Sequence, residues 1–518
     1  MPHRLLLSVL GVAFVLLAGC AGIRQDHAVV PAQAFDRPLE TMLGRAHAAG
    51  EQRHAGQSGF RLLNNGVSAL LTRAALIDAA ERSIDLQYFI FDADDTGFFL
   101  LERLLAAADR GVRVRILLDD YLIGFDDVTL SRIDAHANVE VRVFNPYPDR
   151  LWPRALQLMM RPSRLGHRMH NKIFVVDGQM GVVGGRNIGN HYFEGESESN
   201  FRDADMLATG PVVREAAAIF DSFWNSPMVV PVAAFGVSPS ATTNDALAAW
   251  RATTADFGSH QEYRRRQAEF RQRVLSGEGL IWAPARAVGE PPIRQAEGAA
   301  KSSAEVARVH AIARQKAQRE ITYAVAYFVP GERGVEVLCQ VAARGVRVRV
   351  LTNSLAATDV VPVHSGYAPY REALLAGGVE LYEYRHDAPR PTPAAGHRLR
   401  KGRSESALHA KVAVYDRQRL WIGSANFDPR SRHLNTEAGV MIESEALAGQ
   451  VLATLERDLD ATHSWRLTLD PEKPAGQRLV WNGLRKGQPW RGTSEPDASA
   501  WRRFSSGFYR LLGIESLL

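Results

Sequence analysis

The hydrophobic and polar positions of this chain form the same pattern twice, at an offset of about 235–240 residues. Each copy has a β-rich run, a helical pattern, the segment Arg-Gly-Val-Arg-Val-Arg and a second β-rich run, at 83–90, 98–108, 110–115 and 139–144 in the first copy and at 320–328, 335–343, 344–349 and 379–384 in the second. Strands that alternate with helices are typical of α/β folds. The constant offset predicts two duplicated lobes, each a mostly parallel, mixed β-sheet flanked by helices, rather than a short solenoid repeat.

Shifts in composition indicate how the rest of the chain is organised. We expect a signal peptide at 1–19, a lipid-anchored tether at 20–57, the first lobe at 58–231, an inter-lobe connection at 232–278, the second lobe at 279–466 and a basic aromatic C-terminal tail at 467–518. Two segments of mixed apolar and basic character, 151–164 and the helical pattern at 498–512, suit either a membrane surface or packing against a lobe.

The N-terminus has a basic start and an apolar run over 5–18 that is too short to span a bilayer and predicts a secretory signal. The sequence Leu-Ala-Gly-Cys at 17–20 resembles the lipobox of bacterial lipoproteins, which implies that Cys20 carries the lipid anchor. Ala21 is similar to the pattern of lipoproteins sent to the outer membrane, so we expect the periplasmic face of that membrane in a bacterial cell envelope. An ordinary signal peptide or an uncleaved anchor is the alternative. The second cysteine, Cys339, is expected to be a buried small hydrophobe, and no disulfide is predicted.

Charge narrows the choice of partner only slightly. The chain of 518 residues has a formal net charge of +5 and a pI near 9.2. This balance favours anionic partners, which could be lipid headgroups or nucleic acid.

The same set of polar residues begins a β-rich run in each copy. The set is a His-x-Lys pair, an Asp five residues after the Lys and the Asn of a Gly-x-x-Asn turn, and it comprises His170, Lys172, Asp177 and Asn187 in the first copy and His409, Lys411, Asp416 and Asn426 in the second. Residues i and i+2 of a strand share a face, so His and Lys point together. The Gly-x-x-Asn turn lets a backbone and an amide approach an anion closely. Two complete copies therefore predict one functional site.

These residue types suit chemistry on a phosphodiester. Two Lys ammonium groups and two Asn amides can neutralise and orient the non-bridging oxygens of the phosphate. One His can attack phosphorus to give a phosphohistidine, which splits a difficult displacement into two easier ones. The other His, with an ordinary pKa of about 6.5, can protonate the leaving oxygen and then deprotonate the incoming hydroxyl. This chemistry requires no metal, and we expect no cofactor.

The paired motifs resemble the HKD motifs of the phospholipase D superfamily, and the segments 168–172, 183–189 and 426–431 are similar to cardiolipin synthases of the C-type branch. The resemblance covers about residue 58 to the C-terminus. It implies an active site at the pseudo-twofold interface between the lobes. It also implies that His170 is the nucleophile and His409 the acid/base, two roles that the residues alone do not separate.

The resemblance extends to residues outside the motifs. Glu437 resembles the carboxylate that orients the motif His in this superfamily, and Asp203 occupies the equivalent place in the first copy. Solvated loop charges are the alternative for both. We expect Asp177 and Asp416 to act structurally, through salt links or turn bonds.

The resemblance implies a phosphatidyltransferase that makes cardiolipin from phosphatidylglycerol, with phosphatidylethanolamine or a second phosphatidylglycerol as donor. The expected partners are anionic and zwitterionic phospholipids at a membrane surface. Whether an accessory protein is needed is not decided by the sequence, and no nucleic acid is expected as a partner. A phospholipase D or another phosphodiesterase, including a nuclease, would use the same residues with water. A non-enzymatic envelope lipoprotein is a further alternative, against which the intact motifs argue.

Overall fold

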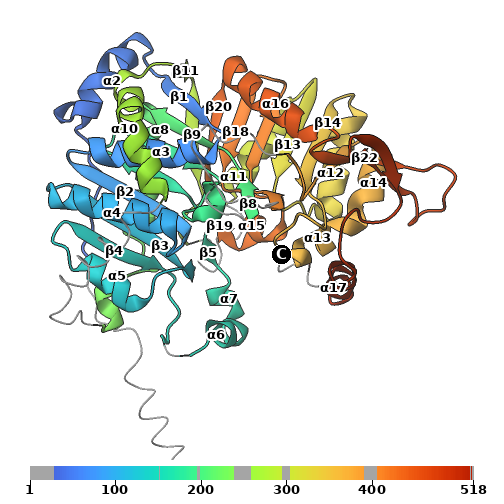
Figure 1. The fold of residues 1–518 in the computed structure, drawn as a ribbon, viewed down its shortest axis with the longest axis horizontal. Helices are drawn as coiled ribbons and strands as arrows, with labels where there is room; N and C mark the ends of the chain where they lie inside the picture. Colours follow the sequence, from blue (N-terminus) through green and yellow to red (C-terminus); the bar gives the residue numbers. More distant parts are fainter. Residues whose placement is uncertain are drawn as a thin grey trace, which may run out of the picture.

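The structure is a computed structural model that describes residues 29–150, 152–194, 199–237, 258–293, 304–389, 405–513 and 515. The expected signal peptide and Cys20 lie outside these residues. Within them the chain forms two lobes that lie side by side, the first coloured blue to green and the second yellow to red (Figure 1). Among the described helices, none combines the length and the apolar character that crossing a bilayer requires.

The first lobe is built on a nine-stranded sheet with the order β10-β4-β3-β2-β6-β7-β9-β1-β11. Its strands are β1 (Ser58–Leu63), β2 (Ser83–Phe91), β3 (Arg113–Ile123), β4 (Val139–Phe144), β6 (Ile173–Val176), β7 (Met180–Gly184), β9 (Asp205–Thr209), β10 (Val229–Pro231) and β11 (Ile281–Ala283). The helices of this lobe include α3 (Gly66–Ala79), α4 (Asp95–Asp109), α5 (Asp127–Asp134) and α8 (Pro211–Trp224).

The second lobe repeats this plan on a ten-stranded sheet with the order β12-β20-β18-β17-β13-β14-β15-β21-β22-β23. Its strands are β12 (Ala285–Gly289), β13 (Glu320–Val325), β14 (Arg347–Asn353), β15 (Glu380–Tyr384), β17 (Lys411–Tyr415), β18 (Arg419–Gly423), β20 (Ala438–Glu443), β21 (Ser464–Leu469), β22 (Leu479–Arg485) and β23 (Gln488–Gly492). The helices of this lobe include α11 (Glu305–Lys316), α12 (Gly331–Ala343), α13 (Val361–Tyr367), α14 (Arg371–Ala376), α15 (Pro429–His433) and α16 (Glu445–Leu459).

The duplicated α/β lobes with mixed sheets are confirmed, but the expectation of mostly parallel strands was wrong. Within the two large sheets, parallel pairing is confined to β2, β3 and β4 and to their counterparts β13, β14 and β15. The other pairs in both large sheets are antiparallel, including the hairpins β6–β7 and β17–β18 that follow the two motifs. Tight turns join those hairpins, and only antiparallel neighbours can be joined by so short a turn.

Alternation along the strands places the core on both faces of each sheet. In β6, Phe174 and Val176 pack with the helices α3 and α4, whereas Ile173 and Val175 belong to a second cluster with α8. This second cluster also contains Leu447 of α16 in the other lobe. The two lobes therefore share a buried apolar core, which fixes their relative position.

The chain passes from the first sheet to the second within a few residues. Strand β11 pairs with β1 of the first lobe, and β12 pairs with β20 of the second lobe. The lobes thus meet at Pro284, a few residues after the expected boundary at 279. Helix α10 (Gly258–Ser276), from the expected connection, packs against α3 of the first lobe (Figure 1).

The described parts of the expected tether and tail are packed onto the lobes. Helix α2 (Met42–Arg53) buries Leu43, and the buried ring of His47 hydrogen-bonds through Nε2 to the carbonyl of Val274 at 2.7 Å. At the other end of the chain, β22 and β23 extend the second sheet, and helix α17 (Ala500–Leu511) follows them.

Two short strand pairs link the lobes at their interface. Strand β5 (Arg168–Met169) pairs in parallel with β19 (Asn435–Thr436), and β8 (Ser199–Arg202) pairs in parallel with β16 (Glu405–Leu408). Strands β5 and β16 each precede a His-x-Lys motif, so they correspond to one another, as do their partners β19 and β8. Exchanging the two lobes therefore superimposes one strand pair on the other. The motifs therefore lie at a pseudo-twofold interface, as expected.

Candidate active site

The first motif histidine is buried at the end of β5 and is held by the second lobe. Its Nδ1 lies 2.9 Å from Oε2 of Glu437, and its backbone N–H donates to the carbonyl of Thr436 at 3.0 Å. The ring of Phe89 meets that of His170 edge-on, with 5.0 Å between centroids. With Nδ1 engaged, Nε2 is the ring nitrogen of His170 that remains for a substrate.

The second motif histidine mirrors this arrangement with the lobes exchanged. Nδ1 of His409 lies 2.6 Å from Oδ2 of Asp203, and the backbone N–H of His409 donates to the carbonyl of Arg202 at 2.8 Å. The ring of Tyr192 packs edge-on against that of His409 at 5.0 Å. Each histidine is therefore oriented by a carboxylate of the opposite lobe. The sequence identified both carboxylates but not that the pairs cross the interface.

Both motif lysines are buried beside their histidines. Nζ of Lys172 donates to the carbonyl of His170 at 2.5 Å and lies 5.4 Å from the ring centroid of Phe89. Nζ of Lys411 donates to the carbonyl of His409 and lies 3.0 Å from Nε2 of the same ring. Burial lowers the pKa of Lys411 to about 8 and that of Lys172 well below its usual value.

The motif groups influence one another across the interface. Burial lowers the pKa of His170 well below its usual value, and the ammonium groups of Lys172 and Lys411 lower it further. Burial and Lys411 also lower the pKa of His409 to about 4. In the unliganded protein both imidazoles are therefore neutral at neutral pH, as a nucleophile requires.

The two orienting carboxyl groups differ in charge. Burial would raise the pKa of Asp203, but the charge that His409 carries when it is protonated and the hydrogen bond between the two residues hold that pKa below its usual value. Burial raises the pKa of Glu437 to about 7, although Lys172 and two serines oppose this shift. The serines are Ser424, whose hydroxyl donates to Oε2, and Ser431, whose hydroxyl donates to Oε1 at 2.8 Å. We had not predicted them, and their only sequence signal is that they flank Asn426.

The motif aspartates serve the turns, as expected. The carboxylate of Asp177 accepts from the backbone N–H groups of residues 81, 82 and 83 at 2.8–3.0 Å. Asp416 accepts in the same way from residues 318, 319 and 320 at 2.8–3.1 Å. Both residues adopt a positive φ, 52° and 53°, which Asp tolerates better than most residues. They join the turn after each motif strand to the start of the neighbouring antiparallel strand, β2 or β13.

The two motif asparagines are not equivalent. Oδ1 of Asn187 accepts from the backbone N–H of Ile90 at 3.2 Å, and Nδ2 donates to the hydroxyl of Tyr192 at 3.0 Å. Asn187 thus ties together the wall of the site. Oδ1 of Asn426 is buried without a hydrogen-bond partner among the described residues. The amide of Asn426 is therefore the better placed of the two to meet a substrate.

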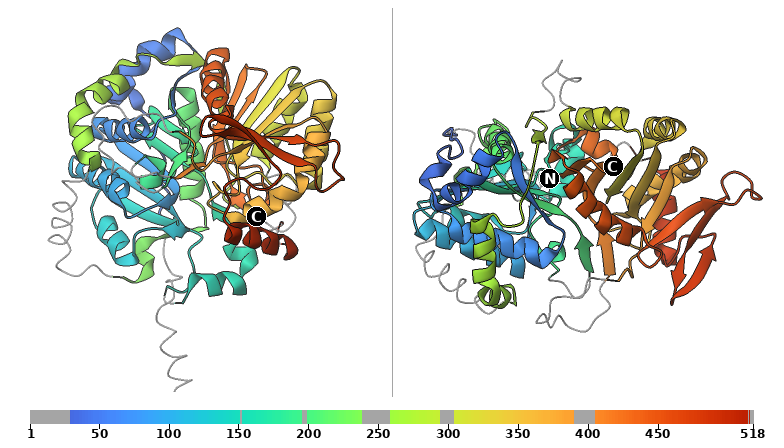
Figure 2. Two further views of the ribbon diagram at one scale, coloured as in Figure 1. Left: turned by 45° about the vertical axis from the view of Figure 1, so that its right-hand side comes forward. Right: turned by 90° about the horizontal axis from the view of Figure 1, so that it is seen from above.

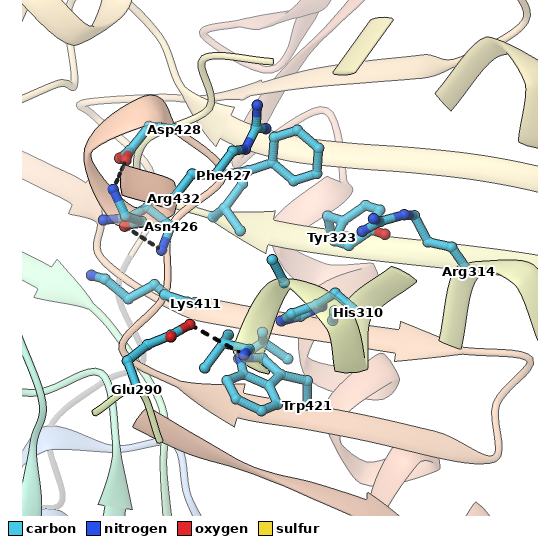
Figure 3. A pocket seen from close by; sticks show the side chains of 17 residues that line it. Glu290, His310, Arg314, Tyr323, Lys411, Trp421, Asn426, Phe427, Asp428 and Arg432 are labelled. Atoms are coloured by element: carbon cyan, nitrogen blue, oxygen red, sulfur yellow. Dashed lines mark hydrogen bonds between the residues drawn. The ribbon is translucent and has the colours of Figure 1, made fainter. Parts of the chain in front are cut away.

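A pocket reaches the catalytic strand of the second lobe. It has a volume of about 100 Å³ and is lined by Lys411, Asn426 and Trp421 together with Arg314 of α11 (Figure 3). Since a water occupies about 10–15 Å³ on this scale, the pocket can hold several waters or a small polar group. The corresponding space in the first lobe measures about 10 Å³. One reason is that the first lobe pairs Leu86 with Phe174, where the second lobe pairs Tyr323 with Ala413.

Two clusters among the described residues have ligand types that could hold a metal, which the sequence had not indicated. One comprises His364, Glu383 and Glu495, and the other His386, Asp387 and Asp497. In the first cluster the guanidinium of Arg371 lies 3.1 Å from Glu383 and 2.7 Å from Glu495. An internal cation already neutralises these carboxylates, so the first cluster is an ion-pair network.

The fold and the site together define a class of protein, that of the phospholipase D superfamily with two His-x-Lys motifs in one chain. A family model described as "Cardiolipin synthase, PLD-like domain" matches residues 74–224 and 312–459. The chain belongs to this family.

Individual relatives agree with this assignment. The chain is 38% identical to cardiolipin synthase C of Escherichia coli (strain K12) over 474 residues, which cover 90% of this chain and 97% of that protein. It is 28% identical to cardiolipin synthase B of the same strain, covering 74% and 76% of the two chains. The crystal structure of phosphatidylserine synthase from Haemophilus influenzae Rd KW20 shares the fold, with a TM-score of 0.56 and 15% identity over 92% of this chain and all of that one. The protein is an enzyme of this superfamily, a transphosphatidylase of the cardiolipin synthase type.

Proposed function

We propose that this enzyme makes cardiolipin by transferring a phosphatidyl group onto phosphatidylglycerol through a phosphohistidine intermediate. The observation that carries the proposal is the crossed pairing of His170 with Glu437 and of His409 with Asp203. Both histidines are held at Nδ1, so Nε2 of each would meet one phosphate, with Nζ of Lys411 beside Nε2 of His409. Such an arrangement suits a two-step displacement with one nucleophile and one acid/base.

The charges of the two carboxyl groups support the assignment of roles. An acid/base histidine alternates between neutral and cationic forms, and an ionised carboxylate at Nδ1 stabilises the cation. Asp203 has a lowered pKa and stays ionised, so His409 is the better acid/base. Glu437, with a pKa raised to about 7, offers less negative charge to His170, which suits the nucleophile.

In the first step, Nε2 of His170 attacks the phosphorus of the donor lipid. The bond from phosphorus to the headgroup oxygen breaks. His409, which takes up a proton once the phosphate anion lies beside it, gives that proton to the headgroup oxygen. In the second step, His409 takes the proton of a primary hydroxyl of phosphatidylglycerol, the hydroxyl oxygen attacks phosphorus, and the phosphorus–nitrogen bond breaks. One phosphodiester replaces another, and Lys172 and Lys411 stabilise the charge at phosphorus in both steps.

Hydrolysis is the alternative outcome of the same intermediate, with water in place of the second lipid. To distinguish the two, full-length protein in detergent would be incubated with phosphatidylglycerol and deuterated phosphatidylethanolamine, and the lipids resolved by mass spectrometry. We expect cardiolipin, whose deuterium content identifies the donor, and no product from His170→Ala. Phosphatidic acid as the only product would overturn transfer and favour a phospholipase D.

A further inference from the structure

We propose that the enzyme docks onto an anionic phospholipid bilayer through two apolar ridges, one from each lobe, that lie on either side of the active-site entrance. This inference rests on the proposed function, because it supplies the route by which lipid substrates reach the site. Figures 1 and 2 place the two elements concerned, α6 (Arg154–Met160) and α17, at the same end of the molecule.

The first ridge, here called the α17 ridge, consists of Trp501, Phe504, Phe508 and Leu511. Their spacing places them on one face of the helix. Three of these side chains are unusually exposed, at 72% for Trp501, 63% for Phe504 and 86% for Leu511. Exposed apolar clusters of this kind on a surface helix mark interaction sites.

The opposite face of α17 is fastened to the second lobe. The guanidinium of Arg502 donates to the carbonyls of Leu355 and Thr358 at 3.1 and 2.8 Å. Just beyond the helix, Glu515 accepts from the hydroxyl of Tyr370 at 2.8 Å. The sequence left open whether this helix meets a membrane surface or packs against a lobe. One face of α17 packs on the second lobe, and the other presents an apolar ridge outwards.

The second ridge, here called the α6 ridge, consists of Leu156, Met159 and Met160 in the first lobe. Met159 is 79% and Met160 is 65% exposed. The neighbouring Trp152 is also exposed. Large apolar side chains, Trp among them, beside Arg are typical of helices that lie in a membrane interface.

Charge identifies the kind of surface that the ridges fit. The helices α6, α7 (Pro162–Leu165) and α17 contain Arg but neither Asp nor Glu. Arg161 and Arg164 beside the α6 ridge and Arg503 and Arg510 on α17 are exposed. Each Arg near an anionic bilayer adds to its attraction, so the ridges fit a membrane that contains phosphatidylglycerol rather than a neutral one.

Short chains of contacts connect both ridges to the catalytic histidines. On the first side, Phe89 packs on His170 and on Tyr121, whose rings lie 5.0 and 5.9 Å from that of Phe89. The side chain of Arg154 in α6 donates to the carbonyl of Tyr121 at 3.5 Å. Tyr121 and the adjacent Leu122 are exposed, so large apolar side chains lie on the surface between α6 and the site.

On the second side, the loop that anchors Arg502 continues to Asp359. Oδ2 of Asp359 accepts from the hydroxyl of Tyr327 at 2.8 Å, and its charge acts on His409 and Lys411. The α17 ridge thus sits on the loop that borders the second motif. A bilayer that contacts both ridges faces the entrance to the site.

Binding is tested separately from turnover in full-length protein that carries Cys20→Ser, to prevent acylation, and His170→Ala, to prevent consumption of the lipid. Vesicles of phosphatidylcholine and phosphatidylglycerol in equal parts would include brominated phosphatidylcholine, which quenches tryptophan within the bilayer. We expect quenching that decreases when Trp501→Phe is introduced, and weaker binding to vesicles of phosphatidylcholine alone.

The ridges themselves are tested by substitution in the same background. Phe504→Ser with Leu511→Ser, or Met159→Ser with Met160→Ser, is expected to weaken vesicle affinity by about tenfold, because apolar area no longer enters the bilayer. Leu39→Ser is the matched control, since Leu39 is 64% exposed in the first lobe but belongs to neither ridge. Circular dichroism would verify that all variants fold.

Activity then connects docking to the site. In the protein with His170 intact, the ridge variants are expected to lose turnover on phosphatidylglycerol vesicles but to keep turnover on dihexanoyl phosphatidylglycerol below its micellar concentration. If the protein with intact ridges turns over neither substrate, the proposed function fails while the binding result still stands.

Three outcomes would overturn the docking proposal. The first is vesicle binding without quenching that depends on Trp501, which would mean that another face meets the membrane. The second is an equal loss of affinity in Leu39→Ser and in the ridge variants. The third is a dimer in size-exclusion chromatography that dissociates on Phe504→Ser, which would show that a second copy covers the ridge.

Discussion

At the scale of single residues, the site depends on how each imidazole is held. The carboxyl groups of Asp203 and Glu437 contact Nδ1 of a histidine on the opposite lobe, whereas the proposed reaction at phosphorus uses Nε2. Such partners fix the tautomer and the direction of the ring. Their removal should therefore affect the rate more than the binding of lipid.

Asp203→Asn should lower kcat by a factor on the order of 10² to 10⁴ while KM changes little, because an amide neither favours the correct tautomer of His409 nor stabilises its cation. Glu437→Gln should cost less, since the carboxyl group of Glu437 is already partly protonated near pH 7. Steady-state kinetics on mixed micelles would measure both. A larger loss in Glu437→Gln than in Asp203→Asn would reverse the roles assigned to the histidines.

The charge of Lys411 sets a second prediction, on pH. Burial lowers its pKa to about 8, so the ammonium group is present below that pH and is lost above it. Because the cation stabilises charge at phosphorus, kcat/KM should fall as pH rises through about 8. Lys411→Arg keeps the cation at higher pH and should remove this decline, even if its maximal rate is lower. The same alkaline decline in Lys411→Arg would assign it to another group.

At the scale of elements, we predict that the turns beside the motifs contribute to stability rather than to the chemical step. Asp177→Ala removes an acceptor from three backbone N–H groups at the start of β2 and should lower the free energy of unfolding by about 1–3 kcal/mol. The specific activity of the folded fraction should be retained. Denaturant titration with an activity assay below the transition would measure both effects, with Asp36→Ala on the exposed N-terminal segment as control. A folded variant without activity would give Asp177 a catalytic role.

The sequence predicted local features well because they depend on neighbours in the chain. The motif strands, the turns capped by Asp177 and Asp416 and the helix over 500–511 all follow from residue patterns. The proportion of parallel strands was overestimated. The strand after each motif turns back as an antiparallel hairpin, and the direction in which a strand turns back is not visible in the hydrophobic pattern. Pairing of His170 with Glu437 depends on the docking of two lobes, which no local pattern encodes. The internal hydrogen bonds of Asn187 were missed because they depend on how its turn packs against Ile90 and Tyr192 within the first lobe.

At the scale of the whole molecule, one chain supplies the complete site. The pairs β5–β19 and β8–β16 join its two lobes, and the buried cluster that contains Phe220 and Leu447 spans them. Each lobe provides one histidine and the carboxylate for the other. Partial sites on separate copies should therefore not combine.

Mixing the variants His170→Ala and His409→Ala should leave activity at the level of either one alone, because each chain keeps its own lobes together. Cardiolipin formation by the co-expressed variants would measure this, with wild-type protein diluted into either variant as the positive control. Activity restored by mixing would mean that lobes are exchanged between copies.

Because each carboxylate comes from the opposite lobe, an incompletely folded chain has no complete active site. A newly made or partly unfolded chain can have its first half in place and still hold a histidine without its partner, with no counterpart to accept or return a proton. Such a chain can touch a membrane without cutting its lipids. Catalytic activity therefore requires that both lobes have folded and docked. A reaction that would be harmful in the wrong place cannot begin before that last step of assembly.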